Sequence, residues 1–361
     1  MTIEPVQSKL RFVLEKYDIF PKENISLCFF SMANEVFFIK DAKKNKFVLK
    51  NCMKNNSSEL LITEIALMKH LNENECRCPE VAPDKNGKRI VEYNGDYFIL
   101  YKYLEGEKLD WNKKIKNYHL SESIAGLAKY HKAVSPLDKT YDTDRIKSYE
   151  SEKIIQWAES LKKVLTNDKS GRASFKTMLG IIEKILFYAK SFSNYISLET
   201  INNLENLMIH GDFHPWNCSF KSRKFYACFD FDFIRRDLKI FDISWTLMIL
   251  KRRFYIRHFG NKVFQKNFTP AKEDFYAIET KVLHWFLDHY RKNYIISDEE
   301  IHYLPAMEIA RFLFIVRFFK PENSEEECVR HTDWFKKVLS NLDETYNNLR
   351  TITDSAIKKP K

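Results

Sequence analysis

The first hundred residues alternate short apolar runs with polar breaks. Runs of this length are typical of β-strands. The breaks at residues 43–45 and 94–96 are rich in Lys, Asn, Gly and Asp, so neighbouring runs can pair as antiparallel hairpins. The pattern predicts a five-stranded antiparallel sheet with strands at residues 25–31, 35–40, 46–52, 88–93 and 97–103.

Helical patterns interrupt this sheet once and then dominate the rest of the chain. Apolar residues from Leu60 to Leu71 fall at helical spacing, which predicts a helix over residues 57–71. After Gly106 the same spacing recurs in long amphipathic segments, with a β-like island between them at residues 207–209 and 218–233. The predicted helical segments are 121–134, 147–166, 173–192, 272–293, 297–319 and 326–349. We therefore expect an α+β fold, with a small sheet domain at 1–103 and a larger, mainly helical domain at 104–361.

The composition is that of a globular protein. The 361 residues are 44% hydrophobic and 15% aromatic, which is enough to bury a core and argues against disorder. No run approaches the roughly 20 apolar residues that span a bilayer, and the N-terminus does not resemble a signal peptide. We expect a cytoplasmic protein without a membrane partner.

The net charge of +10 raises the question of a nucleic-acid partner. The basic residues are spread along the chain among Asn, Asp and Glu, and no basic stripe is interleaved with aromatic residues. A solvated, lysine-rich surface is therefore expected rather than a nucleic-acid interface. The electrostatic field of these positive charges would also favour an anionic substrate such as a nucleotide.

The cysteines argue for a reducing compartment. Seven scattered cysteines do not form a disulfide framework. Cys76 and Cys78 are the only close pair, and no second cysteine pair supplies further zinc ligands. We expect buried or loop thiols here rather than a metal site.

A group of polar residues follows the apolar run at 207–209. The segment HGDFHPWN occupies residues 210–217, and Asp230 follows a second apolar run. The side chains of Asp212, Asn217 and Asp230 can therefore converge at one end of a hairpin. Carboxylate and amide oxygens suit Mg²⁺, which keeps waters and substrate phosphates as its other ligands.

These residues fit the needs of phosphoryl transfer. The reaction requires a cation to neutralise charge and a free carboxylate to accept the proton of the attacking hydroxyl, and Asp212 is the candidate base. The alternative is a turn in which Asp and Asn side chains only cap the backbone. His214 is interpreted as part of the loop scaffold, because a loop histidine more often forms local hydrogen bonds than binds a metal and no Gly-x-Ser-x-Gly motif is present.

The segment from His210 to Asp242 resembles the catalytic and metal-binding loops of the aminoglycoside phosphotransferase family. Relatives of that family include choline, homoserine and methylthioribose kinases and the CotS-type spore-coat proteins. The resemblance implies a bilobal, protein-kinase-like fold whose N-terminal lobe binds ATP, with Asp212 as base and with Asn217 and Asp230 on Mg²⁺. It also implies that Asp242, in the segment FDISW, braces the catalytic loop together with His210.

A kinase-like fold further predicts a lysine on the third strand and a helix glutamate that holds it. Lys50 near the end of the run at 46–52 matches the nucleotide-contacting lysine of the family. Glu64 lies on the apolar stripe of the predicted helix, where an unpaired carboxylate would be costly, so Lys50 is its expected partner. Glu59 is the alternative.

Other nucleotide contacts are implied by resemblance alone. Residues 30–35 contain no glycine, which departs from the phosphate-covering loop of protein kinases, but Asn34 matches an Asn that small-molecule kinases of this family have there. Residues 99–106 resemble the segment that joins the lobes. Backbone groups near Lys102 and Leu104 would hydrogen-bond adenine.

The acceptor is expected to be a small molecule. Asp232 stands where protein kinases have the glycine of D-F-G, and no A-P-E element follows, which argues against a protein substrate. Asp232 is either a further metal ligand or a surface acid, and it is also a candidate for contact with the acceptor. Arginines would suit a carboxylate, and Trp or Tyr an alkyl-ammonium group or a sugar; for the arginines on the helix at 297–319, surface snorkelling is the alternative. The candidates are Arg235, Arg236, His284, Trp285, Arg311 and Arg317.

The sequence thus favours transfer of the ATP γ-phosphoryl group, with Mg²⁺, to a hydroxyl of an amino alcohol, amino acid, sugar or aminoglycoside. The alternative is a catalytically silent kinase-like protein, such as a CotS-type component of the spore coat.

Overall fold

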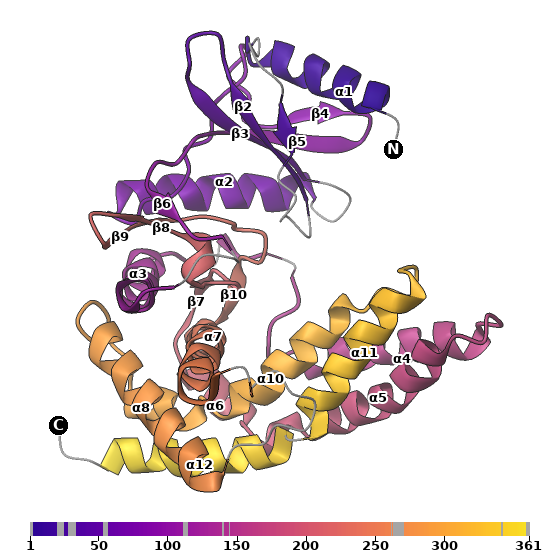
Figure 1. Cartoon of the computed structure of the whole chain (residues 1–361), viewed down its shortest axis with the longest axis vertical. Coiled ribbons are helices and arrows are strands. Elements are labelled where there is room, and N and C mark those ends of the chain that lie inside the picture. The colour runs from indigo at the N-terminus through magenta and orange to yellow at the C-terminus, as the bar shows by residue number, and fades with distance from the viewer. Residues whose placement is uncertain are drawn as a thin grey trace. The chain divides into compact units, whose positions relative to one another are not determined.

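The computed structural model describes residues 3–19, 25–27, 34–52, 57–110, 115–138, 141–143, 145–260, 262, 271–340 and 342–358. The chain divides into two compact units (Figure 1), of which the first comprises Met1–Thr143 and Pro215–Phe231 and the second Asp144–His214 and Asp232–Lys361. The chain therefore passes between units inside the segment 210–217 and again directly after Phe231.

A five-stranded antiparallel sheet forms the centre of the first unit, as the sequence predicts. The strand order is β1-β2-β3-β5-β4, and in the β3–β5 pair Lys50 lies opposite Ile99. Part of the predicted first strand, residues 28–31, lies outside the described residues. The strands are β1 (Ser26–Leu27), β2 (Glu35–Lys40), β3 (Lys46–Cys52), β4 (Val91–Tyr93) and β5 (Asp96–Lys102).

Two helices cover opposite faces of this sheet (Figure 1). Helix α1 (Ile3–Lys16), which the sequence analysis did not predict, packs Val13 and Leu14 against Leu49 and its neighbours in one core. Successive side chains of a strand point to opposite faces, so Lys50 points to the other side, toward α2 (Ser58–Glu73). Helix α2 begins where the Ser57 hydroxyl accepts a hydrogen bond from the Leu60 N–H at 3.2 Å.

The rest of the first unit is a second, three-stranded sheet beside a helix. Strand order is β6-β8-β9, and α3 packs on β9. The helix can approach closely because Gly126 has no side chain: a Cβ there would lie 2.4 Å from the Phe225 ring. The elements are β6 (Glu107–Lys108), α3 (Asn117–Val134), the 3₁₀ turn η3 (Pro215–Asn217), β8 (Cys218–Lys221) and β9 (Lys224–Cys228).

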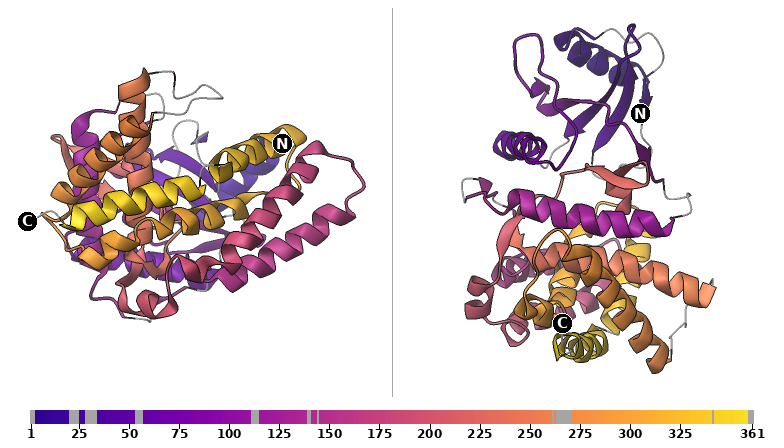
Figure 2. Two further views of the ribbon diagram at one scale, coloured as in Figure 1. Left: turned by 90° about the horizontal axis from the view of Figure 1, so that it is seen from below. Right: turned by 90° about the vertical axis from the view of Figure 1, so that its left-hand side faces the viewer.

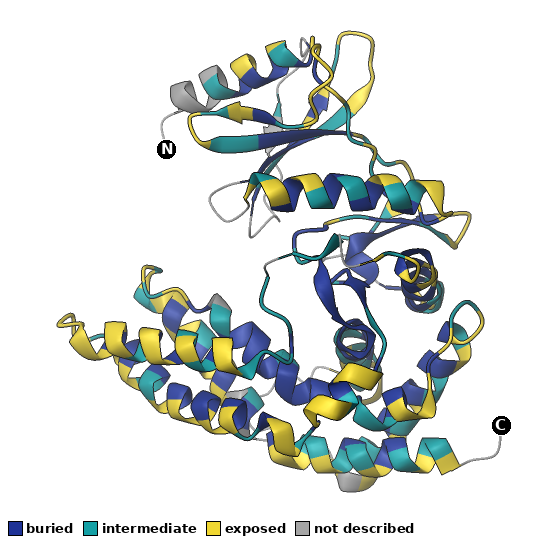
Figure 3. Ribbon diagram, turned by 180° about the vertical axis from the view of Figure 1, so that it is seen from behind, coloured by how far each residue is buried: buried dark blue, intermediate teal, exposed yellow. Residues whose placement is uncertain are grey.

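The second unit is mainly helical. Strand β7 (Asn206–Ile209) pairs antiparallel with β10 (Arg235–Leu238), and β10 leads directly into α7 (Lys239–Phe259). Helices α4, α5 and α11 lie side by side (Figure 2). Buried residues line the inner faces of the helices, and exposed residues line the outer faces (Figure 3). The remaining elements are α4 (Ser151–Asn167), α5 (Ala173–Lys190), η2 (Phe192–Asn194), α6 (Leu198–Asn203), α8 (Lys272–Tyr290), α9 (Asp298–Tyr303), α10 (Ala306–Ile315), η5 (Val316–Phe318), α11 (Glu325–Ser340) and α12 (Leu342–Lys358).

Several helix boundaries differ from the prediction. The helix expected over 297–319 is two helices, because Pro305 cannot continue α9 and instead precedes the first residue of α10. The segment expected over 326–349 is also divided between α11 and α12, and α12 continues to Lys358. In the ranges described above, no helix is long and apolar enough to cross a membrane. The α+β class is confirmed.

Candidate active site

The loop that carries Asp212 is held by a carboxylate from α7. Strand β7 ends at Ile209, and Asp242 in the first turn of α7 is fully buried. Its Oδ2 accepts the His210 backbone N–H and its Oδ1 accepts that of Gly211, both at 2.8 Å. A helix N-terminus stabilises such a carboxylate. Asp242 thus fixes the backbone immediately before Asp212.

Gly211 is required by the geometry of this loop. Its φ is +79°, and a Cβ there would lie 2.3 Å from the Phe233 carbonyl oxygen. On the other side of Asp212, the Thr246 hydroxyl donates to the Phe213 carbonyl at 2.8 Å. The loop backbone is therefore fixed on both sides of the candidate base.

The Asp212 side chain is 19% exposed. The His214 Nε2 lies 3.4 Å from its Oδ1, and the backbone N–H of Asp212 donates to His210 Nδ1 at 3.4 Å. Both histidines thus contact Asp212, and their role as the scaffold of the loop stays a prediction. A partly exposed carboxylate on a fixed backbone can accept a proton from a bound hydroxyl.

Asn217 and Asp230 lie near each other in the first unit. They flank the β8–β9 hairpin, in which Cys218 is opposite Cys228, and the Phe229 N–H donates to the Asn217 carbonyl at 3.0 Å. Asn217 is buried and Asp230 is exposed with φ +70°, a left-handed conformation that is uncommon for a residue with a side chain. An amide and a carboxylate at one hairpin end are a donor set that fits Mg²⁺. The predicted convergence with Asp212 remains a prediction.

The cysteines of the first unit gather although they are far apart in sequence. Cys76 and Cys78 are buried, and Cys78 Sγ donates to the Met68 carbonyl at 3.1 Å. A hydrogen bond with Cys76, together with burial, raises the pKa of Cys228, and burial raises the pKa of Cys218. These shifts favour the protonated form of both thiols. Among the described residues, no three His, Cys, Asp or Glu side chains form a metal-binding group.

Lys50 and Glu64 form a buried ion pair. The Lys50 Nζ lies 3.4 Å from Glu64 Oε1, and the Tyr101 hydroxyl donates to the same oxygen at 3.1 Å. Glu59 is exposed on α2, so the predicted pairing with Glu64 is confirmed over this alternative. The sequence analysis missed Tyr101, because its place depends on the pairing of β3 with β5. The nucleotide-binding role of Lys50 stays a prediction.

The other predicted nucleotide contacts are only partly described. Asn34 is buried at the start of β2, while residues 30–33 lie outside the described residues. At the end of β5 the Lys102 N–H donates to the Glu80 carbonyl at 2.8 Å, and its ammonium lies 2.6 Å from the Glu80 carboxylate. The Leu104 carbonyl accepts from the Lys108 ammonium. Adenine binding by this segment stays a prediction.

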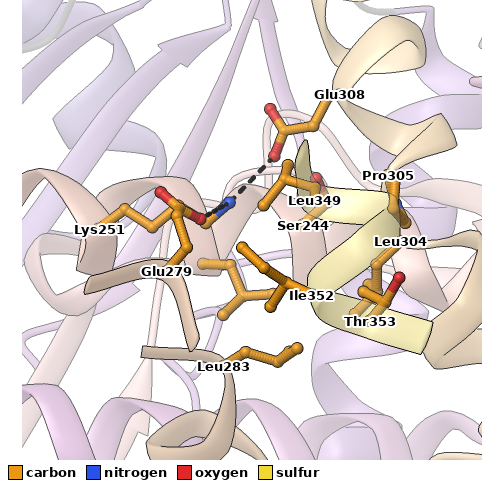
Figure 4. Close-up of a pocket in the computed structure, with 11 residues that line it drawn as sticks. Ser244, Lys251, Glu279, Leu283, Leu304, Pro305, Glu308, Leu349, Ile352 and Thr353 are labelled. Carbon is orange, nitrogen blue, oxygen red and sulfur yellow. Dashed lines mark hydrogen bonds and ion pairs between the residues drawn. The ribbon is translucent and has the colours of Figure 1, made fainter. Parts of the chain in front are cut away.

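Arg311 belongs to a buried ion-pair network in the second unit. The Lys251 Nζ lies 2.7 Å from Glu279 and 3.5 Å from Glu308 (Figure 4). The Arg311 guanidinium also pairs with Glu308. Burial raises the pKa of Glu279; at Glu308 the effect of burial is outweighed by Arg311 and Lys251, so its pKa is lowered. Two cations thus balance two carboxylates. The adjoining cavity of about 20 Å³ has room for one water and not for a substrate.

The remaining acceptor candidates lie apart from this network. Trp285 on α8 packs on Phe254, with ring centroids 5.7 Å apart. Asp232 is 9% exposed directly after the chain enters the second unit. Arg235 is fully buried on β10, and its Nε donates to Asp237 at 2.9 Å. These candidates thus come from different elements of the second unit.

Several solved structures with this fold are small-molecule kinases or phosphotransferases. Amicoumacin kinase hAmiN in complex with AMP-PNP, Ca²⁺ and Ami is 17% identical, with a TM-score of 0.62 over 95% of this chain and 96% of that chain. The microcompartment-associated aminopropanol kinase is 11% identical, with a TM-score of 0.62 over 95% and 98%. An aminoglycoside phosphotransferase from Alicyclobacillus acidocaldarius is 13% identical, with a TM-score of 0.58 over 96% of both chains. These likenesses confirm the predicted kinase-like fold.

The sequence comparisons establish the family. A search of curated proteins found no match. The profile of the family described as "APH: Phosphotransferase enzyme family" matches residues 31–261, which is more than half of the chain. The matched residues include β2, β3, α2, the loop of Asp212 and the turn of Asp242. The chain therefore belongs to the phosphotransferase enzyme family.

Proposed function

We propose that the protein transfers the γ-phosphoryl group of ATP to a hydroxyl of a small molecule. The observation that carries this proposal is the Asp212 loop, in which both oxygens of a buried Asp242 hold the two backbone N–H groups before a partly exposed carboxylate. Membership of the phosphotransferase family supports it. The acceptor is an amino alcohol, an amino acid, a sugar or an aminoglycoside.

Asp212 acts as the base in this proposal. The acceptor oxygen attacks the γ-phosphorus while its proton moves to a carboxylate oxygen of Asp212. The bond to the bridging oxygen breaks, and ADP leaves with that electron pair. Because the loop backbone is fixed before the substrate arrives, little further ordering is needed for the transfer.

Asn217 and Asp230 would hold Mg²⁺, which when bound neutralises charge on the phosphate oxygens. Lys50 would contact the α- and β-phosphates. The ion pair with Glu64 positions its ammonium, and the Tyr101 hydroxyl donates a hydrogen bond to the same carboxylate oxygen. The lysine is therefore oriented before nucleotide binds. Asn34, Lys102 and Leu104 are the further candidates for nucleotide contacts.

The test is ADP release that depends on an acceptor. Mg-ATP is supplied with a panel of amino alcohols, amino acids, sugars and aminoglycosides, and the Asp212→Asn variant is the blank. Release by the native protein alone, with one class of acceptor, supports the proposal and identifies the substrate. If ATP binds but no acceptor on a broad panel causes release, the proposed activity is wrong.

A further inference from the structure

Arg235 in the second unit is a buried cation with an unused donor. Its guanidinium carbon lies 4.6 Å from the ring centroid of Phe241 and 4.5 Å from that of Phe314. The Nε donates to Asp237 at 2.9 Å and the Nη1 to the Phe233 carbonyl at 3.3 Å. Among the described residues, the buried Nη2 has no hydrogen-bond partner. Leaving a buried donor without a hydrogen-bond partner costs free energy. We therefore expect a group outside the described residues to accept this hydrogen bond.

A second guanidinium shares the Phe314 ring. The guanidinium carbon of Arg317 lies 4.7 Å from its centroid, and the Nε makes a long contact of 3.5 Å with the Phe314 carbonyl. In the described part of the chain, no carboxylate forms an ion pair with Arg317, which is half-buried and so remains accessible to a ligand. Burial and the nearby Arg235 lower the pKa of Arg317 to about 10.

The acidic groups nearby already have other partners. Asp237 already accepts four hydrogen bonds: two from Ser148 at 2.7 Å, one from Arg235, and one from the Leu238 N–H at 2.8 Å. The other acid whose charge acts on Arg317 is Glu150. The Glu150 carboxylate also forms an ion pair with the Lys153 ammonium, 2.9 Å away.

Further positive charge acts on the same place. Arg145 also lowers the pKa of Arg317. Two guanidinium groups, those of Arg235 and Arg317, thus share the Phe314 ring, and among the described residues Asp237 is the only carboxylate that forms an ion pair with either of them. The network around Arg311 shows the contrast, because there Lys251 and Arg311 meet Glu279 and Glu308.

This cationic cluster lies beside the loop of the candidate base. A Cβ on Gly211 would lie 3.0 Å from the Arg235 Nη1. The Arg235 guanidinium is thus packed against the residue that precedes Asp212 in the same unit. An anion bound at the cluster would lie near the hydroxyl that Asp212 is proposed to deprotonate.

We infer that the acceptor carries a carboxylate, and that Arg317 binds it beside the buried charge of Arg235. The inference rests on the proposed function and narrows it to hydroxy acids and hydroxylated amino acids. A planar guanidinium matches the two oxygens of a carboxylate, and the interaction is stronger where little water enters. Cationic acceptors without an acidic group would be repelled from this place.

Pairs of acceptors that differ only in the carboxylate test this inference. Serine is compared with ethanolamine, threonine with 1-amino-2-propanol, and homoserine with 3-aminopropanol in the ADP-release assay. We expect release with a carboxylate-bearing member. For that acceptor, Arg317→Met should raise the KM about 10- to 100-fold while the KM of ATP changes by less than about 2-fold. Release only with carboxylate-free members overturns the inference and leaves the kinase activity intact.

Two further variants separate binding from folding. Arg317→Lys keeps the charge and loses the planar fork, so its KM should lie between those of the native protein and Arg317→Met. Arg330→Met removes an exposed arginine from α11 and is the matched control, which should leave both KM values unchanged. A rise in the KM of ATP with Arg317→Lys, instead of that of the acceptor, would assign the cluster to a nucleotide phosphate and overturn the inference.

A binding measurement covers the case in which no acceptor turns over. L-2-Aminobutyrate and 1-aminopropane differ in the carboxylate and have no hydroxyl, so calorimetric titration reports binding alone. The native protein should bind the acid and not the amine, and both Arg317 variants should weaken that binding. Equal binding of the two probes, or no binding of the acid, overturns the inference whatever the ADP assay shows.

Discussion

At the scale of single residues, the candidate residues of the site can be predicted from the sequence, but the contacts that hold them in place cannot. Asp212, Asn217 and Asp230 could be named because each follows an apolar run. The sequence did not indicate Tyr101 as a partner of Glu64, because that contact depends on strand pairing. Likewise, only the structure shows that the Arg235 Nη2 has no hydrogen-bond partner among the described residues. It also shows that the neighbouring Asp237 already accepts two hydrogen bonds from Ser148.

Gly211 should be intolerant of any side chain. Gly211→Ala places a Cβ at a residue with positive φ and also brings it against the Phe233 carbonyl oxygen. Gly87→Ala has the same backbone strain, but its Cβ has no neighbour within 4 Å. We expect the free energy of unfolding to fall further for Gly211→Ala than for Gly87→Ala, by about 1–3 kcal/mol. Urea unfolding of both variants measures the difference. Equal losses would show that the close approach to Phe233 has no energetic weight.

Glu64 should matter more than Glu59 on the same helix. Glu64→Ala leaves the buried Lys50 without its carboxylate, which should lower the free energy of unfolding by about 3–5 kcal/mol and weaken ATP binding. Glu59→Ala removes an exposed charge and should change neither quantity appreciably. Chemical denaturation and nucleotide titration of the two variants provide the comparison. Similar behaviour would exclude the special role of Glu64.

At the scale of elements, amphipathic helices are easier to predict than buried ones. Helix α7 was missed because its first half is buried on nearly all sides, including the polar Lys239 and Asp242, so its apolar residues show no clear period. Helix α10 was joined to α9 because the apolar spacing continues through Pro305. The five strands were predicted, because turn residues separate them.

The contact between α5 and α11 should make stability depend on pH. Glu325 accepts the Ser174 N–H at 3.0 Å and pairs with Arg172 at 2.8 Å. Hydrogen bonds from Ser174 and Arg172 lower the pKa of Glu325 from 4.5 to about 2. The folded-state pKa is below the unfolded one, so this contribution is present above pH 4.5 and is lost as the pH falls toward 2.

Unfolding by urea at pH 6, 4 and 3 tests this assignment. The free energy of unfolding of the native protein should fall with pH over this range. The Glu325→Gln variant should lose less stability, because its side chain does not titrate. If both proteins lose the same stability, other acids account for the effect.

At the scale of the whole molecule, the family and fold class follow from sequence more readily than the substrate. The motif from His210 to Asp242 indicates the phosphotransferase family, and the profile match over residues 31–261 establishes it. The residues of the acceptor site cannot be predicted in the same way, because the candidates come from separate helices and strands. Only the structure shows that Arg311 forms an ion pair with Glu308, whereas Arg317 forms none with the described residues.

The most direct test of the proposed active site is turnover by Asp212→Asn with the acceptor found in the panel. Removing the base should lower kcat by about 10²- to 10⁴-fold, while calorimetric titration should give an ATP affinity within about 2-fold of native, because the substitution keeps the size of the side chain. Turnover at the native rate would contradict the role of Asp212 as the base.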